Sequence, residues 1–186
     1  MADPVAHYFF AVPVPEPVRS HLHAQSQTLR KHLPYKQWTH RDDYHLTLAF
    51  LGAVADNRIE TFTHEAAQVA GQSSPFSLAI NGIGTFGTRE RPRVLWAGVR
   101  EDERLHVLQK GVAEASKAAG YEPDRRPYRP HITLAKKWNG TETIDRNVLP
   151  NGFHSAPWTV DAFILYRIDR SNFPKYFPLR TFAFSR

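Results

Sequence analysis

Two kinds of apolar pattern alternate along this chain. Runs of β-branched and aromatic residues predict strands at residues 7–14, 44–51, 76–83, 93–99, 158–168 and 176–184, with a further strand beginning at His131. Apolar residues that recur every three or four positions predict helices at residues 15–33, between residues 56 and 71, and at residues 101–119. The pattern therefore favours a mixed α and β protein.

The order strand, helix, strand occurs twice, and both copies end in nearly the same sequence. HLTLAFLG begins at His45 and HITLAKKW begins at His131. Phe10, in the middle of the first strand, precedes His45 by 35 positions, and Trp96 precedes His131 by the same interval. We therefore expect a single domain, residues 1–186, with two similar lobes built roughly from 1–90 and 91–186, related by an approximate two-fold axis and exchanging strands at the termini.

Composition narrows the chemistry that this chain can perform. The 186 residues include 24 Lys and Arg against 18 Asp and Glu, a net charge of +6, so the surface should attract anions, of which nucleic acid is the commonest. A protein that is merely basic is the alternative. The absence of cysteine excludes disulfides, thiolate metal sites and cysteine nucleophiles. The apolar run near the start is too short and too broken by prolines for a signal peptide or a membrane span, so we expect a cytoplasmic protein. The sequence says little about oligomeric state, and we expect a monomer.

The two repeated strands present histidine beside threonine. Side chains two positions apart on a strand share a face about 7 Å apart, so His45 points with Thr47, and His131 points with Thr133. A two-fold axis would bring the two sets face to face across a cleft. In-line displacement at phosphorus needs a base on one side and an acid on the other, and histidine, with an ordinary pKa of about 6.5, can be either. The threonine hydroxyls could donate to the non-bridging oxygens, and no metal is required.

A single H-x-T in an apolar strand is usually only a strand with one polar side. Two copies with matched upstream elements favour the paired catalytic hypothesis.

The ordered set HLTLAFLG and HITLAK, with YFFAVPVP, RPRVLWAGV and RPHITLA, resembles the two-histidine (2H) phosphoesterases. It is most similar to the RNA 2′,3′-cyclic phosphodiesterases, historically called 2′-5′ RNA ligases. The resemblance implies a bilobal α+β fold with antiparallel sheets around a central cleft and helices outside. It also implies hydrolysis of an RNA 2′,3′-cyclic phosphate to a 2′-phosphomonoester without a cofactor. The family's proton donor and proton acceptor correspond to His45 and His131, respectively.

One position departs from the family's pattern. Related sequences often have arginine five positions after the second histidine, where this chain has Lys136. Lysine keeps the charge but loses the two-pronged geometry for phosphate. Strand alternation also predicts that Lys136 faces away from His131 unless a bulge redirects it.

Three further residues are candidates for substrate binding. Arg129 and Tyr128, just before His131, could hold a phosphate or stack on a base, or could belong to a solvated loop. Phe50 could stack on a nucleobase. His21 and His23 invite a metal hypothesis, but positions i and i+2 do not share a helix face, so we expect no metal.

Other functions remain open at this level. The same catalytic pair could serve 2′-5′ ligation, or the opening of another cyclic or 2′-5′-linked nucleotide. The chain could also be a non-catalytic module that binds RNA ends. The sequence does not identify the RNA substrate or its length.

Overall fold

The computed structural model describes residues 6–100, 102–122, 124 and 126–185. Three α-helices are found in the described ranges: α1 (Glu16–Arg30), α2 (Ile59–Gly71) and α3 (Glu103–Ala118). The strands are β1 (Ala6–Pro13), β2 (Tyr35–Trp38), β3 (His45–Val54), β4 (Phe76–Leu78), β5 (Ile80–Gly87), β6 (Pro92–Val99), β7 (His131–Trp138), β8 (Trp158–Val160), β9 (Ala162–Ile168) and β10 (Tyr176–Ala183). Single 3₁₀ turns are η1 (Arg41–Asp43), η2 (Asp56–Arg58) and η3 (Arg146–Val148). The α+β class expected from the sequence is confirmed.

Two four-stranded antiparallel sheets form the framework. The first sheet has the order β10-β9-β1-β3 and the second has the order β2-β7-β6-β5, while β4 and β8 form a small separate pair. The strands β9-β1-β3 of the first sheet correspond to β5-β6-β7 of the second, with the histidine strand third in each. Each sheet takes strands from both halves of the chain: β9 and β10 join the first, and β2 and β5 join the second.

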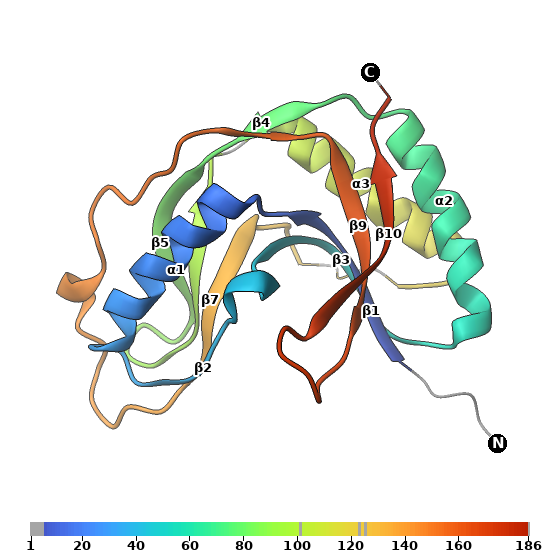
Figure 1. The fold of residues 1–186 in the computed structure, drawn as a ribbon. Coiled ribbons are helices and arrows are strands. Elements are labelled where there is room, and N and C mark those ends of the chain that lie inside the picture. Colours follow the sequence, from blue (N-terminus) through green and yellow to red (C-terminus); the bar gives the residue numbers. More distant parts are fainter. Residues whose placement is uncertain (1–5, 101, 123, 125, 186) are drawn as a thin grey trace.

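The helices cover the outer sides of the two sheets, as Figure 1 shows, and two of them are exchanged. Helix α1 follows β1 of the first sheet but lies over the second sheet. Its His21 stacks on Phe153, and the carbonyl of Phe153 accepts a hydrogen bond from the backbone N–H of Gly82 in β5. Helix α3 follows β6 of the second sheet but lies on the first, where Gln109 donates to the carbonyl of Leu48 in β3. The chain therefore crosses between the sheets at both helices.

The predicted elements are found with local differences. The strands expected at 76–83 and 158–168 are each divided, because β4 and β8 pair with each other before the chain turns at Ala79 and Asp161 to enter the large sheets. Strand β2 was not predicted, since its four residues carry no apolar alternation. The expected first position of the third helix, residue 101, lies outside the described residues.

The equal interval of 35 residues does not give the true register of the two copies. In the ladders Thr47 pairs with Ala11, whereas Thr133 pairs with Trp96. The connecting segments differ by one residue, so Phe10 and Trp96 are not equivalent. Phe10 is 1% exposed and lies in the core, whereas Trp96 lies beside His131.

Candidate active site

His45 and His131 are the first residues of β3 and β7, and the backbone holds both imidazoles in the same way. The Nδ1 of His45 lies 2.7 Å from the carbonyl of Asp43, and the Nδ1 of His131 lies 2.7 Å from the carbonyl of Arg129. A carbonyl can only accept, so each Nδ1 carries a proton and donates it. In the neutral state both Nε2 atoms are therefore left as bases, and both can exchange protons with a bound substrate.

The two histidine strands lie in contact with each other where the two sheets meet. His131 and Lys136 both influence the ionisation of His45, so these three side chains share one electrostatic environment. The structure therefore brings together the two histidines that the repeated motif singles out.

A β-bulge occurs at the same place in both strands. In β3 the register shifts so that Ala49 pairs with Phe10 but Thr47 pairs with Ala11, which leaves Leu48 as the extra residue. In β7 the same shift leaves Leu134 as the extra residue. Each bulge places two consecutive residues in the core and reverses the alternation that follows.

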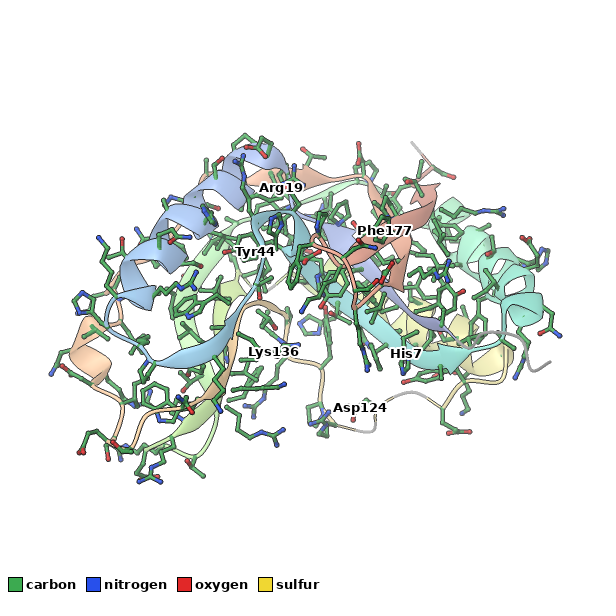
Figure 2. The ribbon with its side chains drawn as sticks, turned by 60° about the horizontal axis from the view of Figure 1, so that its bottom comes forward. His7, Arg19, Tyr44, Asp124, Lys136 and Phe177 are labelled. Atoms are coloured by element: carbon green, nitrogen blue, oxygen red, sulfur yellow. The ribbon has the colours of Figure 1, made fainter. Side chains whose placement is uncertain are left out.

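The bulges return the fifth residue after each histidine to the inner face. These residues are Phe50, which is 48% exposed, and Lys136, which is also exposed. Lys136 lies between the two sheets in Figure 2. The expectation from simple alternation that Lys136 faces away from His131 is wrong, and the bulge is the reason. Strand β3 therefore offers an aromatic ring at this position, and strand β7 offers an ammonium group.

Aromatic rings enclose His45. The ring centroids of Phe9 and Tyr176 lie 4.7 Å and 4.9 Å from that of His45, and Tyr166 lies at 6.4 Å. Burial among them lowers the pKa of His45 to about 4; the hydrogen bond to Asp43 acts in the opposite direction, and the charges of Lys136 and His131 lower it further. His45 is therefore neutral at pH 7 in the free protein.

His131 has a different wall, made by Phe86 and Trp96. Their ring centroids lie 4.8 Å and 6.3 Å from the imidazole. The indole lies against the second sheet at two glycines, since a Cβ on Gly84 or Gly98 would come within 2.3 Å or 3.2 Å of it. Burial lowers the pKa of His131 as well, and Lys136 adds to the effect.

The two threonines stand on the same face as their histidines. The hydroxyl of Thr47 lies 3.1 Å from Nε2 of His45, and because that nitrogen is unprotonated the hydroxyl donates to it. Thr133 is half-buried at the matching place in β7. Both hydroxyls can turn toward a bound phosphate.

Tyr128 and Arg129 occupy the connection before β7. The hydroxyl of Tyr128 donates to the main-chain carbonyl of Thr47 at 3.0 Å. This side chain therefore links the connection before β7 to strand β3. The side chain of Arg129 is exposed, while its carbonyl holds His131. The structure thus gives both residues contacts with the motif strands.

Several groups around the histidines were not predicted from the sequence. They are Phe9, Asp43, Phe86, Tyr166, Lys175 and Tyr176. Most reach the site from distant parts of the chain, and strand alternation alone does not place them. Asp43 could have been noticed, because it stands two positions before the first histidine.

Among the described residues, no three histidine or acidic side chains lie together in a way that could hold a metal ion. None of the described helices has the length and apolar character needed to cross a bilayer.

The fold and the paired histidine strands define the class of two-histidine phosphoesterases, and comparisons with known proteins agree. The structure of E. coli LigT complexed with 3′-AMP superposes with a TM-score of 0.80 at 26% identity, covering 98% of this chain and 100% of that one. An RNA 2′,3′-cyclic phosphodiesterase of Bacillus subtilis is 34% identical over 100% of both chains. Another, of Geobacillus stearothermophilus, is 39% identical over 95% of this chain, which spans 57% of that longer protein.

The family model described as the 2′-5′ RNA ligase superfamily matches residues 17–172, a range that includes both histidine motifs. The chain belongs to the 2′-5′ RNA ligase superfamily.

Proposed function

We propose that this protein is an RNA 2′,3′-cyclic phosphodiesterase that hydrolyses a terminal cyclic phosphate to a 2′-phosphomonoester. The observation that carries the proposal is the matched pair of imidazoles, each bound through Nδ1 to a carbonyl and each presenting Nε2. The relatives named RNA 2′,3′-cyclic phosphodiesterase and the 3′-AMP complex of E. coli LigT support the substrate class.

The reaction requires two proton transfers on opposite sides of phosphorus. Nε2 of His131 accepts a proton from water as the water oxygen bonds to phosphorus. The negative charge of the bound substrate favours the imidazolium form of His45, which carries a proton on Nε2 as well as on Nδ1. The bond from phosphorus to the 3′ oxygen breaks, and this Nε2 donates its proton to that oxygen. The assignment of donor and acceptor comes from the family resemblance. No net proton is consumed by the pair, which is restored by exchange with solvent.

The remaining candidates bind the substrate in this proposal. The hydroxyls of Thr47 and Thr133 donate to the non-bridging phosphate oxygens, and Lys136 supplies a positive charge. Phe50 stacks on the terminal base. Arg129, two positions before His131, contacts the RNA backbone. Tyr128 supports this region through its hydrogen bond to the strand of Thr47. A cytoplasmic location and a monomeric state belong to the proposal as well, to be measured by fractionation and light scattering.

The decisive experiment is hydrolysis of an oligoribonucleotide with a 2′,3′-cyclic phosphate end. We expect H45A and H131A each to lower kcat/KM by on the order of a hundredfold or more, because each loses one proton transfer. His64→Ala, an exposed histidine on α2, is the matched control and should keep wild-type activity. Chelator should leave the rate unchanged, and the product should carry its phosphate on the 2′ oxygen.

Wild-type rates for both histidine variants would refute the mechanism. A panel that adds cyclic mononucleotides, 2′-5′ oligonucleotides and RNA ends to be joined separates hydrolysis from ligation. Binding without turnover on every member would instead favour an RNA-end-binding module.

A further inference from the structure

Asp43 is a buried carboxylate at the end of η1, two positions before His45. It is 3% exposed. Its oxygens accept the backbone N–H of Lys175 at 2.8 Å and 3.1 Å and the backbone N–H of Tyr176 at 3.1 Å. Hydrogen bonds to an ionised acceptor are among the stronger ones in proteins. The carboxylate therefore fastens the turn between β9 and β10 to the segment that leads into β3.

The main chain of the same residue holds the catalytic imidazole. The carbonyl of Asp43 accepts the Nδ1 proton of His45. The ring of Tyr176, whose N–H the carboxylate binds, lies edge-on against His45 at an interplanar angle of 89°. Each of the three residues Asp43, Tyr176 and His45 therefore contacts the other two.

His131 has no matching anchor among the described residues. Its Nδ1 proton goes to the carbonyl of Arg129. The side chain of Arg129 is exposed and is not a carboxylate, so it cannot replace the buried Asp43. Arg129 also lies in an irregular connection between prolines rather than on a 3₁₀ turn. Within the described part of the chain, a buried carboxylate anchor is therefore found only beside His45.

We propose that Asp43 is a positioning residue for His45. By fastening the turn at Lys175 and Tyr176 to η1, its carboxylate fixes the carbonyl that keeps the proton on Nδ1, and so keeps Nε2 directed at the substrate. The same anchor fixes the main chain of Lys175. Burial lowers the pKa of Lys136, and the charge of Lys175 lowers it further. The catalytic meaning of this inference rests on the function proposed above.

The test compares D43A and D43N with the wild type. Alanine removes all three hydrogen bonds, whereas the asparagine amide oxygen can still accept from both N–H groups. We expect D43A to lower kcat on the cyclic-ended RNA by on the order of tenfold to a hundredfold with little change in KM, and D43N to recover much of the loss. Asp145→Ala is the matched control, because it also removes a carboxylate that accepts a backbone N–H, from Asn147 at 2.9 Å on η3; it should keep wild-type kinetics.

A second readout follows the imidazole directly. In ¹⁵N-labelled protein at neutral pH, His45 and His131 should both show a protonated Nδ1 and an unprotonated Nε2. In D43A the His45 signal should shift toward a mixture of tautomers while the His131 signal stays unchanged. A merely structural residue would lower the melting temperature without changing the kcat of the folded protein or the His45 tautomer.

Wild-type kcat in folded D43A, or an unchanged His45 tautomer, would overturn the proposal. The tautomer measurement needs no substrate. If the wild-type protein did not hydrolyse cyclic-ended RNA, the proposed function would fail, while the nitrogen signals would still decide whether Asp43 positions His45.

Discussion

His45 and His131 are the same residue type with the same Nδ1 partner, yet their surroundings differ. Three aromatic rings and the main-chain carbonyl of the buried Asp43 surround His45. Two aromatic rings and an exposed connection surround His131. Burial lowers both pKa values, that of His45 to about 4. A low pKa makes protonated His45 a strong proton donor, but it also makes the protonated form rare in the free protein.

This asymmetry predicts an acidic optimum for kcat/KM, which reports ionisations of the free enzyme. Protonated His45 becomes scarce as the pH rises above about 4, so kcat/KM should decline through neutrality. A bound phosphodiester carries negative charge, which favours the protonated imidazole and raises its pKa. The profile of kcat should therefore lie at higher pH than that of kcat/KM, as measured on cyclic-ended RNA across pH 4 to 9.

Coincident profiles for kcat and kcat/KM, both flat through neutrality, would contradict this account of the pair. Performing the same titration on H131A, with its residual rate, would show which limb belongs to His45.

The residues with a repeated signature could be predicted from the sequence, and their supports could not. Two copies of H-x-T and the alternation of a strand were enough to pair His45 with His131. Asp43 and Tyr176 are separated by 133 positions, and their contact depends on how β9 and β10 return to the first sheet. No local pattern contains that information.

At the level of the strand, the bulges decide which side chains lie on the same face as the histidines. Lys136 lies on the inner face because Leu134 is the extra residue in β7. The sequence did carry a signal for this, since Leu and Ala are adjacent in both copies and two consecutive apolar residues break a strict alternation. The copies then differ in side chain, with Phe50 in β3 where β7 has Lys136.

Replacing Lys136 by methionine tests this placement. K136M should raise the pKa of both histidines, because the ammonium charge that lowers them is removed, and should lower kcat/KM by roughly tenfold through lost phosphate binding. Histidine pKa values come from NMR titration and kcat/KM from the cyclic-ended RNA.

Lys137 provides the control, because it is an adjacent exposed lysine and K137M makes the same change in net charge. Equal effects of K136M and K137M would mean that the general charge of the surface matters and the bulge does not.

At the level of the whole molecule, the two histidine strands belong to sheets that each contain strands from both halves of the chain. The sequence predicted the duplicated order of strand, helix and strand. It did not reveal that α1 and α3 lie on the sheet opposite to their own preceding strands, because an amphipathic pattern says that a helix covers a sheet but not which one. It also missed β2, which is too short for periodicity to detect.

This exchange predicts that neither half folds alone. A fragment of residues 1–90 would keep β2 and β5 without the two strands that lie between them, and it would lack α3 over the first sheet. We expect fragments 1–90 and 91–186 to show little helix or strand signal in circular dichroism and no cooperative unfolding in urea, unlike the full chain. A cooperative transition in the isolated fragment 1–90 would show that the halves are independent domains.

The exchanged helices also constrain how such a protein could have arisen. A half-length chain could cover its own sheet only by pairing with a second copy, each lending its helix to the other, which is the geometry of a domain-swapped dimer. In that ancestor both histidines would have been identical by symmetry. Joining the two copies in one gene would release each from its twin, so that mutation could place Phe50 in one and Lys136 in the other and give the two histidines different surroundings.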